Sequence, residues 1–139
     1  MPIRQMKVDI DGKHISNVLA VDYGLEVSHD VDGSPSDARP RLARVCITRK
    51  SDDSQQLGDW ASKPFRGHFK SGKISFFAPD EETKVQSTMS WTDGFVTLYR
   101  EWVPDIQTHR GDPMVEYIEI SAQKMKINDT EVDADTWTA

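Results

Sequence analysis

Alternation of apolar and polar residues recurs along most of this chain and constrains its fold more than any other feature. Residues 43–48 show it most clearly, in the order Ala-Arg-Val-Cys-Ile-Thr. A period of two is typical of a β-strand with one buried face, because successive side chains point to opposite sides. The same pattern predicts further strands at residues 6–10, 18–28, 73–78, 84–91, 94–103 and 115–127.

One segment, residues 53–62, has helical rather than strand periodicity. Ser51-Asp52-Asp53-Ser54 supplies side-chain oxygens that can cap a helix N-terminus. Leu57, Trp60 and Ala61 follow at the i, i+3, i+4 spacing of one helical face. Pro64 ends the segment, since its ring cannot continue the hydrogen-bond ladder. We expect Leu57 and Trp60 to pack this helix against the strands.

Two Asp-Gly dipeptides are strong hairpin signals, because both central positions of a type I′ turn need positive φ. Asp11-Gly12 follows the first predicted strand. Asp93-Gly94 lies between two long apolar segments, so we expect it to join residues 84–91 to residues 94–103 as a hairpin. Gly24, in the middle of the strand predicted at 18–28, indicates a bend or bulge there.

The number and length of these elements define a fold class. About seven to eight strands and one short α-helix in 139 residues predict a single mainly β domain, a compact β-barrel or two-sheet barrel spanning residues 1–139. The acidic tail, residues 129–139, should be loosely held apart from a short strand around Val132.

Charge and composition exclude several partners and compartments. The net charge of −6, with no basic stripe, argues against nucleic-acid binding. No run of about 20 apolar residues occurs, so we expect no membrane insertion. The first residues lack the apolar core of a signal peptide. Cys46 is the single cysteine, which excludes an internal disulfide and favours synthesis in the reducing cytoplasm.

Residues that could perform chemistry do not cluster in the sequence. His14, His29, His68 and His109 are not spaced as metal ligands, and each lies in or beside a predicted turn. Cys46 lies within a predicted strand, as a packed thiol would. No nucleophile elbow, phosphate-binding glycine loop or zinc-protease motif occurs. We therefore predict no enzyme activity and no catalytic, cofactor-binding or metal residues.

An ordered series of short motifs resembles one protein family. The loop Gly33-Ser34-Pro35-Ser36 leads through Arg39-Pro40-Arg41 into a strand and a Ser/Asp-rich cap. In the C-terminal half, Asp112-Pro113 precedes residues 114–127, a strand rich in Ile, Ser and Ala. This order is similar to the Hcp (TssD) tube protein of type VI secretion systems, across about residues 7–127.

Two departures mark a divergent member of that family. Leu42-Ala43 stands where many members have a Gly or a His-rich pair, and the tail after Asp129 is unlike theirs.

The resemblance implies a structural protein and not an enzyme. It implies homo-hexameric rings that stack into a hollow tube, which a contracting sheath expels. The implied partners are sheath, spike and baseplate proteins of the secretion machine, with effector proteins in the lumen. The protein would assemble in the cytoplasm and then be secreted without a signal peptide. The polar loop before the strand would form the ring-stacking contact through Asp30, Asp32, Ser34, Ser36, Asp37, Arg39 and Arg41.

Two other interpretations remain open at this point. The chain could be a tail-tube subunit of a phage-like or extracellular contractile particle, which the sequence does not distinguish. It could also be a monomeric β-barrel that binds a small ligand, which would require an apolar pocket.

Overall fold

A computed structural model describes residues 6–26, 33, 42–51, 56–63, 66–79, 81–103, 114–122 and 124–133. These residues form nine strands, one α-helix and one 3-10 helix. In chain order, the elements are β1 (Met6–Ile10), β2 (Lys13–Ile15), β3 (Val18–Glu26), β4 (Leu42–Lys50), α1 (Gln56–Ala61), η1 (Arg66–His68), β5 (Lys70–Ala78), β6 (Glu81–Trp102), β7 (Val115–Ser121), β8 (Lys124–Ile127) and β9 (Thr130–Asp133).

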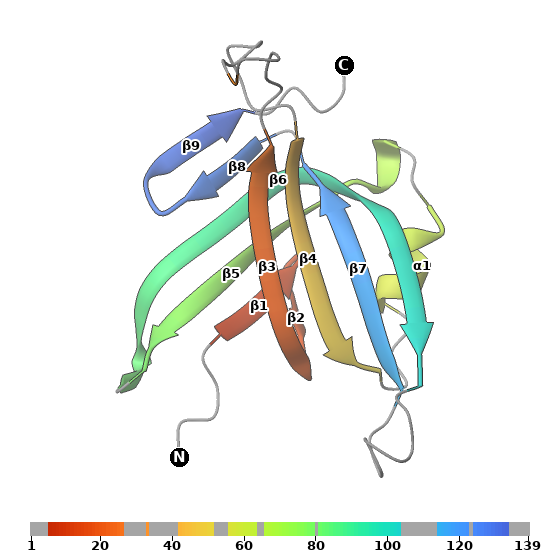
Figure 1. Ribbon diagram of the computed structural model, residues 1–139, viewed down its shortest axis with the longest axis horizontal. Coiled ribbons are helices and arrows are strands. Elements are labelled where there is room, and N and C mark those ends of the chain that lie inside the picture. Colours follow the sequence, from red (N-terminus) through yellow and green to blue (C-terminus); the bar gives the residue numbers. More distant parts are fainter. Residues whose placement is uncertain are drawn as a thin grey trace.

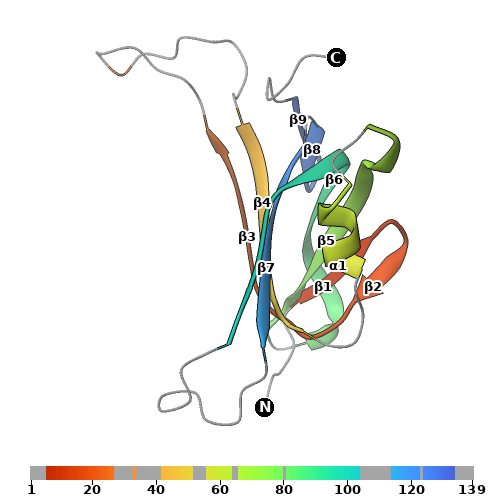
Figure 2. The same cartoon turned by 90° about the vertical axis from the view of Figure 1, so that its right-hand side faces the viewer.

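The strands form two layers that face each other across the core (Figures 1 and 2). We call β3, β4, β7 and residues 95–102 of β6 the front sheet. The back sheet contains β2, β1, β5, residues 81–94 of β6, and the β8–β9 hairpin. All of these pairings are antiparallel.

Strand β6 belongs to both sheets. Its first part pairs with β5, up to Gly94 opposite Lys70, and its second part pairs with β7 from Phe95 onward. Figure 1 shows β6 running along the back layer, bending, and descending at the edge of the front layer. One continuous strand of 22 residues therefore joins the two layers.

The hairpin predicted at Asp93-Gly94 is wrong, because this dipeptide lies at the bend inside β6. Asp93 has a positive φ of 54°, and its N–H donates to the Ser71 hydroxyl at 3.1 Å. Close packing by Trp91 also explains why residues 72 and 94 are glycines. A Cβ on Gly94 would lie 2.7 Å from the Trp91 ring, and one on Gly72 would lie 2.2 Å from it.

Two other turn signals have different outcomes. Asp11 and Gly12 have φ values of 55° and 77° and join β1 to β2 through a two-residue turn, as predicted. Gly24 is not a bulge, because it pairs in regular register with Arg44. The irregularity in β3 lies earlier, between Val18 and Ala20.

The C-terminal segment also differs from its prediction. The single strand expected at residues 115–127 is divided into β7, in the front sheet, and β8, in the back sheet. The strand expected around Val132 is present as β9, paired with β8. Residues 130–133 therefore belong to the sheet rather than to a loose tail; residues 134–139 lie outside the described residues.

The core fills the space between the inner faces of the two sheets. The largest fully buried side chains come from both layers: Trp91, Ile47, Ile74, Met89, Ile118, Ile120, Val8 and Val45. Trp91 also satisfies its indole N–H, which donates to the Lys70 carbonyl at 2.9 Å. This packing holds the bend of β6 in place.

The mainly β fold with one short helix is confirmed, and the layers form an open sheet rather than a closed barrel. Within the described residues, the main strand order is β2-β1-β5-β6-β7-β4-β3, so that it ends at β2 on one side and at β3 on the other. Within the described residues, the front sheet consequently ends in two strands, β3 and β6, that each pair on one side only.

Candidate assembly surfaces

The residues predicted to form a ring-stacking loop lie outside the described residues. This applies to Asp30, Asp32, Ser34, Ser36, Asp37, Arg39 and Arg41. The helical pair is described: Leu57 and Trp60 lie on α1, are each 3% exposed, and belong to the core cluster. Trp60 also donates its indole N–H to the His68 carbonyl at 3.0 Å, which ties α1 to η1.

The front sheet has two unpaired edges in the described part of the chain. At one side, β3 pairs only with β4. At the other side, residues 95–102 of β6 pair only with β7, because β5 and β8 pair with the earlier part of the strand. A strand edge exposes unpaired N–H and C=O groups, which can pair with another chain.

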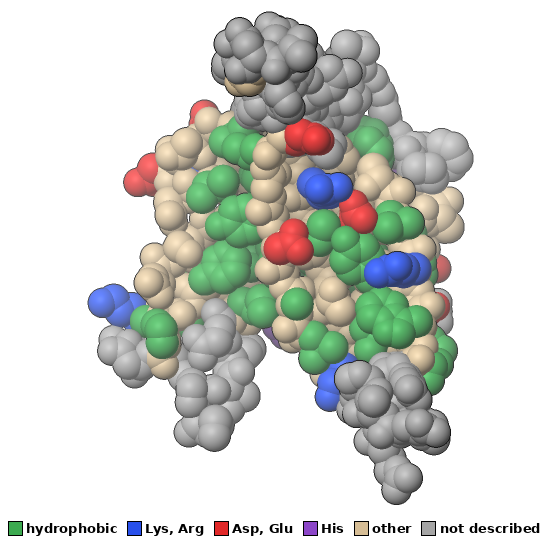
Figure 3. All heavy atoms as spheres, viewed as in Figure 1, with side chains coloured by type: hydrophobic (Ala, Val, Ile, Leu, Met, Phe, Trp, Pro, Cys, Tyr) green, Lys and Arg blue, Asp and Glu red, His purple; other side chains and the backbone are tan. Residues whose placement is uncertain are grey.

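The face of the front sheet turned away from the core contains charged and apolar side chains together. Figure 3 looks onto this face and shows acidic, basic and hydrophobic side chains side by side. In its middle, Arg44 and Glu119 form an ion pair at 3.3 Å. The two edges differ from the middle, because their outward charged side chains form no ion pair with any described residue.

At the β6 edge, Arg100 is the only charged residue that faces outward. Its outward neighbours on the strand are Phe95, Leu98 and Trp102, whereas Val96 and Tyr99 face the core. The Arg100 guanidinium carbon lies 5.2 Å from the centre of the Trp102 ring and 5.1 Å from that of Tyr117. Stacking on two rings restricts an exposed guanidinium and leaves its N–H groups free to donate.

At the β3 edge, both charged residues are acidic. Val21 and Tyr23 pack on the core, so the alternate residues of β3 face outward: Ala20, Asp22, Gly24 and Glu26, all exposed. The two edges of the front sheet therefore present opposite charges on the same face.

A groove runs beside the β6 edge. Helix α1 packs next to β6 (Figure 2), and the space between them has a volume of about 380 Å³. The groove is lined by Gly58, Ala61, Ser62, Val96, Thr97, Leu98 and Tyr99. An added strand at this edge would thus have the helix along one side.

A buried charged network holds the start of β3 to the rest of the front sheet. Arg49 of β4 and Glu116 of β7 form an ion pair and are each 3% exposed. The Tyr99 hydroxyl donates to the other carboxylate oxygen of Glu116 at 2.6 Å. Arg49 Nε donates to the Ser16 carbonyl at 2.9 Å, directly before β3. Burial, together with Glu116, raises the pKa of Tyr99.

Cys46 is a packed thiol on the outward face of β4, 6% exposed. Burial is the main cause that raises the pKa of its thiol, and the nearby Asp22 and Glu119 carboxylates add to this effect. A raised pKa leaves little thiolate at neutral pH, so that the environment of Cys46 disfavours nucleophilic chemistry.

The described residues do not gather into a metal site. No group of three or more His, Cys, Asp or Glu side chains in the described ranges could hold a metal ion. His14 and His68 are exposed, and His29 and His109 lie outside those ranges. In the same ranges, no helix is long and apolar enough to cross a membrane.

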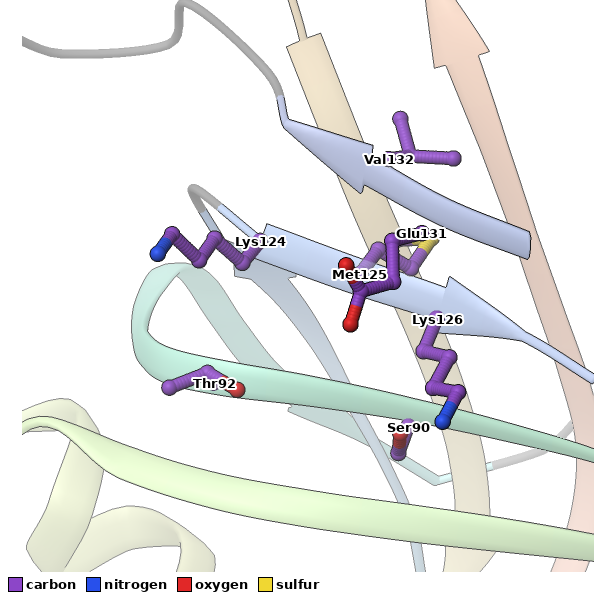
Figure 4. A pocket seen from close by; sticks show the side chains of 7 residues that line it. All are labelled: Ser90, Thr92, Lys124, Met125, Lys126, Glu131 and Val132. Carbon is purple, nitrogen blue, oxygen red and sulfur yellow. The ribbon is translucent and has the colours of Figure 1, made fainter. Parts of the chain in front are cut away.

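One pocket in the described part is lined by polar, charged and apolar side chains together. It lies between β6 and the β8–β9 hairpin and has a volume of about 400 Å³. Figure 4 shows its lining side chains: Ser90, Thr92, Lys124, Met125, Lys126, Glu131 and Val132. This lining does not provide the apolar cavity that a small-ligand barrel would require.

Sequence reasoning missed the edge residues, because an edge is a property of pairing. Arg100 and Asp22 look like ordinary solvated charges until β6 and β3 are placed at opposite sides of one sheet. One signal was available: the period of two in residues 98–102 places Arg100 on the same face of the strand as Trp102.

Comparison with known proteins defines the class of this fold. The chain is similar to Hcp1 from Flavobacterium johnsoniae, with a TM-score of 0.76 and 26% identity over 94% of this chain and 99% of that one. It is similar in fold to a crystallised Hcp protein, with a TM-score of 0.69 and 15% identity over 97% and 100%. A chain of the sheath-tube complex of an extracellular contractile injection system (PVC) has a TM-score of 0.63 and 17% identity, over 94% and 92%.

The open two-sheet domain is thus shared with Hcp proteins and with a chain of a contractile injection system. A family model for the hemolysin coregulated protein Hcp (TssD) matches residues 4–138. The chain belongs to the Hcp (TssD) family. A comparison with curated protein sequences found no match.

Proposed function

We propose that this protein is the structural subunit of the inner tube of a type VI secretion system. Six copies form a ring, and the rings stack into a hollow tube that sheath contraction expels with effector proteins in its lumen. The observation that carries the proposal is an Hcp-family fold whose front sheet ends in two free edges. Its role is mechanical, and no catalytic step is assigned to it.

Strand direction supports a ring built by edge-to-edge contact. The front sheet has four antiparallel strands, so β3 and β6 run in opposite directions. A copy related by simple rotation therefore presents its β3 antiparallel to the β6 edge of its neighbour. Such a head-to-tail contact can close into a ring, which leaves no unpaired front-sheet edge.

The tube would contact sheath, spike and baseplate proteins, would assemble in the cytoplasm, and would leave the cell with the expelled machine. The likeness to a chain of an extracellular sheath-tube complex favours a second candidate, the tube of a free contractile particle. Detection of the protein within sheathed assemblies anchored in cells, rather than in released particles, would distinguish the two.

Ring stacking is assigned to the polar loop between β3 and β4. Its charged residues have both signs, as a contact between identical rings requires. We expect Asp37→Lys, Arg39→Glu and Arg41→Glu together to leave single rings intact and to prevent their stacking. Electron microscopy of concentrated wild-type and variant protein tests this, with the mass of the ring as control. Unchanged tubes in the triple variant would contradict the loop assignment.

A further inference from the structure

We propose that Arg100 on the β6 edge pairs with the acidic β3 edge of a neighbouring copy, Asp22 and Glu26, and that this charge contact selects the ring partner. The inference rests on the proposed ring and names the residues that make its subunit contact specific. The occupant of each free edge is therefore a second copy of this chain.

The two edges of the front sheet are complementary in charge. Arg100 is the one outward charge on the β6 edge, and Asp22 and Glu26 are the two on the β3 edge. None of the three forms an ion pair with a residue in the described part of the chain. Glu101, the residue after Arg100, lies on the opposite face of β6, where the Ser51 hydroxyl donates to it at 3.3 Å.

The charge contact tolerates several registers of the two paired strands. Alternation places Arg100 opposite one of the four outward residues of β3: Ala20, Asp22, Gly24 or Glu26. Long side chains reach the direct partner and the diagonal partners two residues away. If Arg100 lies opposite Asp22 or Glu26, it contacts that acidic residue directly. If it lies opposite Ala20 or Gly24, an acidic residue of β3 is its diagonal partner. Strand stagger in a closed ring therefore preserves the contact.

The guanidinium of Arg100 is preorganised for a carboxylate partner. The rings of Trp102 and Tyr117 hold the guanidinium over the face of the sheet, beside the free edge. Less side-chain entropy is then lost when a carboxylate arrives. An unrestrained surface arginine would lose more freedom for the same contact. The aromatic residues thus act as positioning residues for Arg100.

Charge reversal provides the test. Two proteins reverse the charge of one edge each: the single variant Arg100→Glu, and the double variant Asp22→Arg with Glu26→Arg. We expect each to raise the protein concentration needed for half-maximal ring assembly by about tenfold or more, because like charges then meet at every contact. Lys84→Glu is the matched control: it makes the same charge change on β6, at an exposed position before the bend. Circular dichroism and thermal unfolding should show that every variant is folded.

Mixing the two reversed proteins makes the test specific. Each variant repels itself, but the charge-reversed β6 edge of one complements the arginine-bearing β3 edge of the other. An equimolar mixture should restore rings in which the two variants alternate, which native mass spectrometry would identify as equal numbers of each.

The outcomes separate this inference from the proposed function. If Arg100→Glu formed rings at the same concentration as the wild-type protein, or if the mixture failed to restore rings, the charge contact would be overturned. The ring itself would still stand. Wild-type protein that forms no rings at any concentration would overturn the proposed function first.

Discussion

Two arginines on adjoining parts of the front sheet have opposite environments. Arg49 is buried and paired with Glu116, and it also holds the backbone at Ser16. Arg100 is exposed, stacked on two rings, and forms no ion pair with any described residue. The first arginine therefore contributes to the fold of the subunit. The second contributes little to that fold and is available for a partner.

Charge inside this domain and charge at its edges therefore have separate roles. A buried ion is costly unless it is paired, whereas an exposed ion pair contributes little to folding. Substitutions should consequently divide into those that change unfolding and those that change assembly. Substitutions of buried groups should lower the free energy of unfolding more than substitutions of exposed charges.

Glu116→Leu should have the largest effect, because it removes the carboxylate that is paired with the buried Arg49 charge. We expect it to lower the free energy of unfolding by about 3–5 kcal/mol. Urea unfolding at a fixed protein concentration would measure this, since assembly also adds stability. The control is Arg49→Met, Tyr99→Phe and Glu116→Leu combined, which replaces all three side chains of the network and should stay close to wild type. A small loss in the single variant would contradict the assigned role of the buried pair.

Gly72→Ala should have the next largest effect. Its new Cβ would lie 2.2 Å from the Trp91 ring, so the core at the bend of β6 must move. Overpacking of this kind costs about 1–3 kcal/mol of unfolding free energy. Gly24→Ala is the matched control within another strand, since nothing lies within 4 Å of its Cβ and its φ is not positive. Equal thermal stability of the two variants would show that Trp91 does not require the glycine.

Alkaline pH should lower stability in part through Cys46. Burial raises the pKa of its thiol above the unfolded value of 9.0, so the folded state keeps a proton that the unfolded state loses. Stability from this group is complete below pH 9 and declines as pH rises toward the folded pKa, by at most about 1.4 kcal/mol per pH unit. Unfolding free energies at pH 8, 9 and 10 should fall less steeply in Cys46→Ala. If the unfolding free energies of the wild-type protein and of Cys46→Ala fell equally with pH, a contribution from the thiol would be excluded.

Arg44→Ala should have the smallest effect. Arg44 pairs with Glu119 at 3.3 Å on the solvent-facing side of the sheet. Exposed pairs of this kind contribute about 0–1 kcal/mol. Chemical unfolding of Arg44→Ala beside Glu116→Leu would compare the two positions directly. If both variants lost equal stability, the distinction between interior and surface charge would fail.

The sequence predicted the strands better than it predicted their connections. Period-two alternation located β1, β4 and β5, and the Asp11-Gly12 turn was identified because both residues adopt positive φ. Asp93-Gly94 has the same composition but lies inside a strand, because packing of Trp91 against Gly72 and Gly94 stabilises a bend there. The preferences of neighbouring residues along the chain do not reveal that tertiary contact, so the bend could not be predicted from them.

The assembly surfaces were less predictable than the strands. Residues Leu57 and Trp60 follow from helical spacing, which is local information. The pairing order that makes β3 and β6 opposite edges is not local, and neither is the burial of Arg49 against Glu116, 67 residues away. In the sequence, these charges are indistinguishable from the other charges of an acidic surface.

The mass of the intact protein in solution, measured by light scattering, tests whether the two edges of the front sheet join subunits into a ring. A subunit that pairs through both edges of its front sheet should give a mass near six times 15.8 kDa. Arg100→Glu should shift that mass toward the monomer, while Lys84→Glu should not. A mass of 15.8 kDa for the wild-type protein at high concentration would contradict the account, because the free edges would then have no partner.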